Sequence, residues 1–259
     1  MPSEAFDHIT TALTRPGRHR VWSLIISVFG ELVQSEGSSI EGPVLSALMA
    51  RMNVKPEAVR VALHRLRNDG WIISQKSGRM SCHSLTRYGL GETLEATRLI
   101  YGAPADMPVD WHVAVTAGTD NGQRDRMIAL GYALVAPCVF IGTGQGSIAE
   151  DALVTQADNA PNWLKALLMP AGLTEDYRNL HIILQQIDET LVQANVALSS
   201  LEVAVLRCLI VHDWRRLVLK HPALPRTLYT SDWKGHDCRA LVHKILLHYP
   251  QPALEDLSE

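Results

Sequence analysis

Residues 43–70, PVLSALMARMNVKPEAVRVALHRLRNDG, contain the most informative pattern in the sequence. Each of its two prolines, Pro43 and Pro56, suits the first turn of a helix, and each is followed by an apolar stripe of helical spacing. Only residues 53–55 separate the first stripe from Pro56. Two amphipathic helices joined by so short a turn predict a helix-turn-helix.

The second of these helices is predicted to have one apolar and one polar face. At about 100° per residue, the inward positions are Val59, Ala62, Leu63 and Leu66. The opposite arc includes Arg60, His64, Arg65 and Asn68. Such side chains can reach base edges and phosphates in a major groove. We therefore predict DNA contacts from this arc and from Lys55 at the start of the helix.

A β-hairpin is predicted directly after this helix. Gly70 suits a helix C-cap, and residues 71–75 and 80–85 read as two short strands. Lys76 and Arg79 lie in the turn between them, where they can contact backbone phosphates. An apolar stripe over residues 21–32 predicts one more helix upstream. This order of elements predicts a winged helix-turn-helix.

The charge distribution agrees with a DNA-binding module. The chain has a formal net charge of −3, yet residues 1–100 hold 12 Lys and Arg against 9 Asp and Glu. Within residues 51–87 the basic residues outnumber the acidic ones by 8 to 2. A basic segment beside an acidic remainder indicates a module that meets a polyanion.

The composition indicates a globular protein of two or three domains. Hydrophobic residues make up 47% of the 259 residues and charged residues 20%. The longest nearly apolar run, residues 21–29, is far shorter than the roughly 20 residues of a membrane span. The N-terminus has no apolar leader, and the four cysteines form no CxxC pair. We expect a cytoplasmic protein without a membrane partner.

The remainder of the chain predicts an α+β middle and a helical end. Residues 112–117 read as a strand, residues 123–130 as a helix and residues 132–141 as a second strand. This β-α-β start suggests a ferredoxin-like unit, and the signal is helical from residue 174 onward. We therefore predict an α+β chain with three parts. They are a winged helix-turn-helix domain with a linking helix (1–100), a ferredoxin-like domain (101–172) and a helical effector or dimerisation domain (173–259).

Short motifs along nearly the whole chain resemble those of one known family. They include Ser23-Leu24-Ile25, Arg65-Leu66, Gly70-Trp71, Leu85-Thr86 with Gly89, Leu130-Gly131-Tyr132, Trp214-Arg215-Arg216, Pro222-Ala223-Leu224-Pro225 and Asp232-Trp233-Lys234-Gly235. With these motifs the chain resembles the PaaX family of bacterial transcriptional repressors of phenylacetate catabolism. The resemblance implies a homodimer on operator double-stranded DNA. It also implies release from the operator by an aryl-CoA thioester, typically phenylacetyl-CoA.

An effector of this kind needs an apolar surface and cations for its phosphates. The densest such cluster in the acidic half of the chain is Trp214, Arg215 and Arg216, with Lys220 one turn further on. A tryptophan can stack on an aromatic ring, and an arginine can bind phosphate through two hydrogen bonds. The alternative is that Trp214 packs between helices and that the arginines pair with acids such as Asp213.

No cofactor, metal or catalytic residue is predicted. Residues 142–146, GTGQG, fail the dinucleotide-binding pattern, since Ser147 stands where a glycine is needed, and they read as a flexible loop. The spacing of Cys208, His212, His236 and Cys238 matches no standard zinc site. His212 has no serine or cysteine elbow to serve.

Two other classes of function stay open at this point. A metal-dependent, nuclease-like enzyme with a winged-helix appendage would need carboxylates such as Asp110 and Asp120, which flank the first predicted strand of the middle domain. A winged-helix adaptor would contact only proteins, because a fold does not fix a function. The residues and their order favour a DNA-binding repressor that is not an enzyme.

Overall fold

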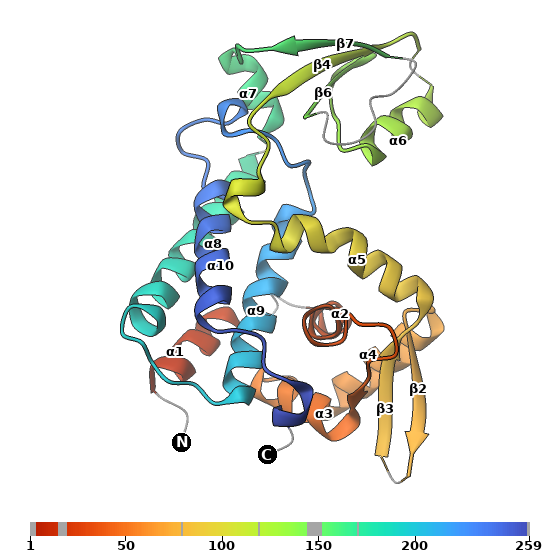
Figure 1. Cartoon of the computed structure of the whole chain (residues 1–259), viewed down its shortest axis with the longest axis vertical. Helices are drawn as coiled ribbons and strands as arrows, with labels where there is room; N and C mark the ends of the chain where they lie inside the picture. Colours follow the sequence, from red (N-terminus) through yellow and green to blue (C-terminus); the bar gives the residue numbers. More distant parts are fainter. Residues whose placement is uncertain are drawn as a thin grey trace. The chain divides into compact units, whose positions relative to one another are not determined.

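The computed structural model is of the α+β class, with many helices and two small antiparallel sheets (Figure 1). The structure describes residues 4–14, 20–78, 80–118, 120–143, 152–169 and 171–257. Within these ranges no helix is both long enough and apolar enough to cross a membrane.

The chain forms two compact units, and both combine distant segments of sequence. The first unit comprises Met1–Ile100, Ile182–Arg215 and Leu241–Glu259. The second unit comprises Tyr101–His181 and Arg216–Ala240. The three-part division that the sequence suggests, with boundaries after residues 100 and 172, stays a prediction.

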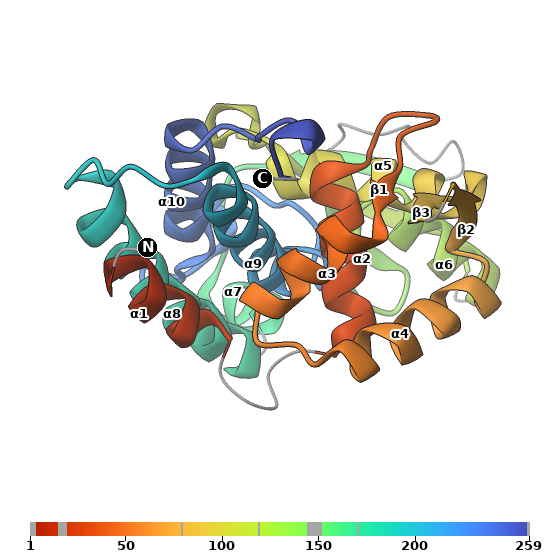
Figure 2. The same ribbon diagram turned by 90° about the horizontal axis from the view of Figure 1, so that it is seen from below.

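The first unit contains the helices and the hairpin that the sequence predicts, together with one more helix and a two-residue strand. The elements are α1 (Glu4–Leu13), α2 (Val21–Leu32), β1 (Ile40–Glu41), α3 (Gly42–Arg51), α4 (Pro56–Asn68), β2 (Ile72–Ser77), β3 (Met80–Leu85) and α5 (Arg87–Tyr101). Pro43 and Pro56 lie in the first turns of α3 and α4, and Gly70 follows α4 with a positive φ of 72°. The strands form an antiparallel sheet in the order β1-β3-β2. α4 packs against α2, α3 and β2 (Figure 2).

The start of α5 is fastened to the end of α4. The Thr86 hydroxyl donates to the Gly70 carbonyl at 2.6 Å and accepts from the Gly89 amide at 3.0 Å, so that it caps α5. A Cβ atom at residue 89 would lie 2.3 Å from the Trp71 carbonyl oxygen, closer than atoms can approach. Glycine is therefore required at this position, which explains the Leu85-Thr86 and Gly89 motif.

The C-terminal part of the chain consists mainly of helices, one of which is long and largely buried. They are α8 (Ala171–Ile187), a π-helical turn (Asp188–Val192), α9 (Ser200–Val218) and α10 (Gly235–His248). Every residue from 202 to 214 is buried, although this stretch of α9 includes charged side chains. Buried charges need partners, and those partners come from α2 and α10.

We call the contacts between α2 and α9 the polar seam, formed by Ser23, Ser27 and Glu31 with Arg215, His212 and Arg207. The three residues of α2 are four positions apart and therefore share one face of an otherwise apolar helix. The Arg215 guanidinium donates to the Ser23 hydroxyl at 3.1 Å, and the Ser27 hydroxyl lies 2.9 Å from Nδ1 of His212. Arg207 Nε donates to Glu31 at 2.5 Å.

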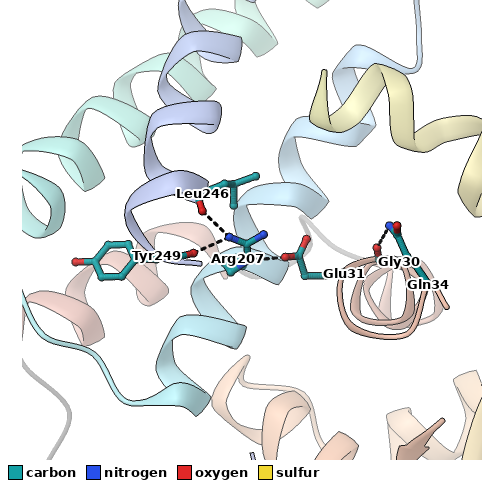
Figure 3. Close-up of polar contacts among 6 residues, drawn as sticks. All are labelled: Gly30, Glu31, Gln34, Arg207, Leu246 and Tyr249. Atoms are coloured by element: carbon teal, nitrogen blue, oxygen red, sulfur yellow. Dashed lines mark hydrogen bonds and ion pairs between the residues drawn. The ribbon is translucent and has the colours of Figure 1, made fainter. Parts of the chain in front are cut away.

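Arg207 also holds the end of α10. Its Nη1 donates to the carbonyls of Leu246 and Tyr249 at 2.7 and 2.6 Å (Figure 3). The side chains of Arg207 and Glu31 are 8% and 1% exposed, so this ion pair is removed from water. One buried guanidinium thus joins α2, α9 and the end of α10 within the first unit.

The second unit contains a four-stranded antiparallel sheet in the order β5-β6-β4-β7. Its elements are β4 (Trp111–Thr116), α6 (Asn121–Ala129), β5 (Ala133–Ala136), β6 (Val139–Gly142), β7 (Ala152–Ala157) and α7 (Asn162–Leu168). α6 contributes Met127 to a core with Ala114, Tyr132 and Phe140. The sheet is therefore packed against α6 on the face that carries these residues.

The single strand predicted for residues 132–141 is wrong, because the structure divides it into β5 and β6. Pro137 has no amide hydrogen for a strand ladder, and Cys138 has a positive φ of 62°. These two residues form the turn of a hairpin. The strand at residues 112–117 and the helix at residues 123–130 are confirmed to within two residues as β4 and α6.

The second unit also contains an aromatic cluster, which we define as Tyr177, His221, Tyr229 and Trp233. The Tyr177 hydroxyl lies 2.7 Å from Nε2 of His221, and the rings of Tyr229 and Trp233 stack with centroids 4.7 Å apart. A Cβ atom at Gly235 would lie 2.5 Å from the Trp233 ring, so that glycine lets the ring pack against the backbone. Two of the motifs near the C-terminus, around Pro222 and Trp233, therefore build the core of this unit.

Candidate nucleic-acid interface

The polar arc of α4 is exposed to solvent, as the sequence predicts. Val59, Ala62 and Leu66 are buried against the rest of the first unit. The side chains of α4 and its N-cap that are predicted to contact DNA are exposed: Lys55, Arg60, His64, Arg65 and Asn68. Leu63 is half-buried and lies at the edge between the two faces. α4 therefore presents a polar and largely basic face that no other described element covers.

Arg60 is held only loosely on this face. Its guanidinium pairs with Glu57 at 2.9 Å, and the two side chains are 73% and 72% exposed. An ion pair so exposed contributes about 0–1 kcal/mol and is readily exchanged for another partner. Arg60 lies in the second turn of α4, and residues near the start of a recognition helix are those that reach base edges.

Arg65 is engaged by its own protein. Its guanidinium carbon lies 5.0 Å from the centroid of the Trp22 ring, a cation–π contact with α2. It also lies 3.4 Å from the Asp69 carboxylate. Arg65 thus faces a different side of α4 from Arg60, and its DNA contact stays a prediction.

The remaining predicted DNA contacts lie at the ends of α4 and in the hairpin. The amide of Asn68 and Nδ1 of His64 are 3.4 Å apart, one helical turn from each other. Lys55 is the N-cap residue of α4, and Lys76 is an exposed residue of β2. Arg79 lies outside the described residues, as does most of the predicted loop at 142–146.

A groove lies between α3, α4 and β3, beside the polar arc. It is open to solvent and has a volume of about 570 Å³. Its lining residues are Gly42, Leu45, Ser46, Val54, Pro56, Val59, Arg60, Leu63, His64, Arg67, Ser81 and His83. Three basic side chains of α4 line it, and none of these lining residues is acidic.

Arg67 is the basic residue of this region that sequence reasoning missed. It lies at the edge of the helical face, outside the polar arc, so the helical spacing does not assign it a DNA contact. The nearby imidazole of His83 is buried and bonded to the Ser74 hydroxyl at 2.7 Å. Burial and the neighbouring Arg67 charge both lower the pKa of His83, which therefore favours the neutral form.

The predicted effector residues are not equivalent in the structure. Trp214 is 1% exposed and donates from Nε1 to the Ile100 carbonyl at 2.8 Å, so its ring is packed in the core of the first unit. Arg215 donates to Ser23 in the polar seam. Arg216 and Lys220 are exposed and belong to the second unit, where Lys220 lies 3.5 Å from Asp176.

Of the residues considered for metal or acid–base chemistry, Cys208 is buried and Asp120 caps a helix. Among the described residues, no three His, Cys, Asp or Glu side chains lie together as a metal site would require. Burial raises the pKa of the Cys208 thiol well above its usual value. Asp120, considered for a nuclease site, caps α6 by accepting the Gln123 amide at 2.9 Å.

Comparisons with known proteins point to one family. The family model for PaaX-like protein matches residues 20–89, and the model for PaaX-like protein C-terminal domain matches residues 170–258. The transcriptional repressor PaaX of Escherichia coli (strain K12) is 28% identical over 263 residues, which cover 92% of this chain and 83% of that protein.

A solved structure also resembles the chain. The uncharacterized protein Rv0674 from Mycobacterium tuberculosis superposes with a TM-score of 0.51 at 21% identity, over 87% of this chain and 93% of that one. A similarity at this level of identity concerns the fold alone. The first matched segment, residues 20–89, runs from α2 to the Gly89 contact and contains the whole basic surface described above.

Proposed function

Since the chain belongs to the PaaX-like family, we propose that it is a DNA-binding transcriptional repressor. The observation that carries the proposal is the exposed polar and basic face of α4, beside a hairpin that carries the exposed Lys76 and a groove without acidic lining residues. The repressor function of the Escherichia coli relative supports it further. We propose no catalytic role.

We propose that the segment from α2 to β3 acts as a winged helix-turn-helix. Support comes from the short α3–α4 connection, the packing of α4 on α2 and the antiparallel β2–β3 hairpin. In such a module α4 lies in the major groove of B-DNA, which is about 12 Å wide and admits one helix. The hairpin then reaches the phosphates beside it.

For the second unit we propose a ferredoxin-like arrangement. The order of strands across the sheet is β7-β4-β6-β5, which are the fourth, first, third and second strands of this unit in chain order, and α6 connects β4 to β5. This matches the split β-α-β pattern of that fold. Two copies of the chain would place two α4 helices on a pseudo-palindromic operator, and we propose a homodimer for this reason.

The DNA contacts can be tested by two substitutions with different expected signatures. Arg60→Ala should weaken binding to the operator by about 1–3 kcal/mol and relax the preference for it, because a base contact carries sequence information. Lys76→Ala should weaken binding to operator and random duplexes alike, since a phosphate contact carries none. Fluorescence anisotropy with duplexes from the promoter of the neighbouring genes, at several salt concentrations, measures both effects.

The affinity of the wild-type chain for DNA should fall steeply as the salt concentration rises. Two chains should bind each operator. Equal losses on all sequences for Arg60→Ala would show that this residue does not read bases. Absence of binding by the wild-type chain at any salt concentration would contradict the repressor proposal and favour a protein-interaction adaptor.

We further propose that an aryl-CoA thioester such as phenylacetyl-CoA releases the repressor from DNA. Of the predicted effector residues, the exposed Arg216 and Lys220 are suited to contact phosphates, whereas Trp214 is packed in a core. If the thioester weakens DNA binding by a given factor, DNA must weaken thioester binding by the same factor.

Calorimetric titration of a panel of CoA thioesters, with and without operator DNA, tests this proposal. We expect one aryl thioester to bind, and we expect DNA to weaken it. Arg216→Ala should weaken the thioester, whereas Arg178→Ala, an exposed arginine paired with Glu175 on α8, should not. If no thioester binds, the effector proposal is wrong. If Arg216→Ala binds the thioester as the wild type does, only the proposed contact at Arg216 is wrong.

A further inference from the structure

The groove between α3, α4 and β3 has one basic wall. Arg60, His64 and Arg67 line it from α4, at spacings of four and three residues that place them along one edge of the helix. The floor is apolar and includes Leu45 and Val59. A basic wall over an apolar floor suits a ligand that combines negative charge with an apolar surface.

The three arginines of α4 differ in what they contact. Arg60 pairs with Glu57, and Arg65 is held by Trp22 and Asp69. In the described part of the chain, no carboxylate lies within ion-pair distance of Arg67, although its side chain is exposed. Arg67 is therefore the arginine of α4 whose charge is not compensated by a neighbour.

We infer that this groove receives the sugar–phosphate backbone of one DNA strand and that Arg67 binds a phosphate there. The inference rests on the proposed DNA-binding function and assigns a site within it. When α4 lies in a major groove, the two backbones of the duplex flank the helix. The backbone on the side of Arg67 then passes between α4 and the start of α3, where deoxyribose rings meet the apolar floor.

The position of Arg67 along α4 separates its role from that of Arg60. Arg67 lies in the last turn of the helix, whereas recognition helices contact base edges mainly with their first turns. A phosphate contact fixes the orientation of the protein on the duplex without reading sequence. Arg67 is thus a positioning residue, and its loss should affect all sequences equally.

The test compares Arg67→Gln with Arg51→Gln, a matched control. Arg51 is an exposed arginine in the last turn of α3 that does not line the groove, and both variants remove one charge. We expect Arg67→Gln to weaken operator and random DNA about tenfold, as the loss of a charge-assisted hydrogen bond does. The slope of log affinity against log salt should fall by about 0.9, the value for one phosphate.

A second pair of variants keeps the test independent of Arg67. Ser46→Glu places a carboxylate in the groove, and Ala50→Glu places one on an exposed position of α3 outside it. We expect Ser46→Glu to weaken DNA far more than Ala50→Glu does. Circular dichroism should show that all four variants are folded.

His83 gives a readout that a purely structural role of Arg67 would not change. Because the Arg67 charge lowers the pKa of His83, a phosphate bound to Arg67 should raise that pKa when measured by NMR titration of the imidazole. In Arg67→Gln the pKa should already be higher without DNA, and DNA should shift it less.

Several outcomes would overturn the inference. One is that Arg67→Gln keeps the DNA affinity and the salt slope of the wild type. Another is that Arg51→Gln loses as much DNA affinity as Arg67→Gln does. A third is that Arg67→Gln loses affinity for one DNA sequence only. Competition by excess inorganic phosphate without any effect on the salt slope would indicate a small-anion site instead. If the wild-type chain binds no DNA at all, it is the proposed function that fails.

Discussion

Glu31→Ala should lower the free energy of unfolding by about 3–5 kcal/mol, the typical cost of removing one partner of a buried ion pair. The Glu31 side chain is 1% exposed and accepts a hydrogen bond from Arg207 Nε at 2.5 Å. Alanine would leave the Arg207 guanidinium buried with only the carbonyls of Leu246 and Tyr249 as partners. A neutral carbonyl cannot replace the carboxylate charge. The cost of desolvating the guanidinium is therefore no longer compensated.

Chemical denaturation followed by circular dichroism measures this effect, with Glu36→Ala as the control. Glu36 is an exposed residue a few positions further along, and its replacement should change the free energy of unfolding by less than about 0.5 kcal/mol. The double variant Glu31→Leu with Arg207→Met should recover only part of the loss. An apolar pair of similar volume is often as stable as an ion pair, but the carbonyls of Leu246 and Tyr249 then lose their donor. If Glu31→Ala lowers the free energy of unfolding by less than about 1 kcal/mol, as substitutions of surface residues do, the result would contradict the burial of this pair.

The polar seam also fixes how α2 lies against α9. A shift of α9 by one turn would place Glu31 opposite Val203 or Val211, both of which are buried and apolar. An unpaired buried carboxylate costs several kcal/mol, so neighbouring registers are strongly disfavoured. Because α2 packs on α4, the C-terminal helices thereby influence the placement of the helix that we propose to contact DNA.

Trp214→Ala should lower the free energy of unfolding by about 3–5 kcal/mol, as large-to-small substitutions of buried tryptophans do. The indole is 1% exposed, and its Nε1 donates to the Ile100 carbonyl at 2.8 Å. Alanine would create a cavity and would leave that carbonyl at the end of α5 without its donor. Trp214→Phe should have a smaller effect, since most of the ring volume stays and only the hydrogen bond and part of the packing are lost.

This prediction separates a core role from the stacking role that the sequence suggested. Trp163→Ala is the matched control, because Trp163 on α7 is 66% exposed and should contribute little to stability. Denaturation and thioester titration should be measured on the same samples. If Trp214→Ala keeps the stability of the wild type and loses only thioester binding, then Trp214 is a ligand platform and the core role is wrong.

The elements that depend on neighbouring residues could be predicted from the amino-acid sequence. Pro43, Pro56 and Gly70 set the ends of α3 and α4, and the apolar period placed Val59 and Leu66 inward. These features follow from the local geometry of the backbone and from a helical repeat that is visible within a short window. The exposed arc with Arg60 and His64 followed from the same repeat.

Which of these side chains remain available, and what the helices bury, depends on contacts between elements that are distant in the sequence. Arg65 lies on Trp22, Arg67 lines a groove, and Trp214 bonds to Ile100, all through contacts between separate elements. Glu31 and Arg207 are 176 positions apart, so no local pattern indicates their pairing. The polar residues at four-residue spacing in α2 were a signal that this face meets something polar. Their partners depend on how distant helices pack, which is set by burial of the whole unit and not by the chain near either residue.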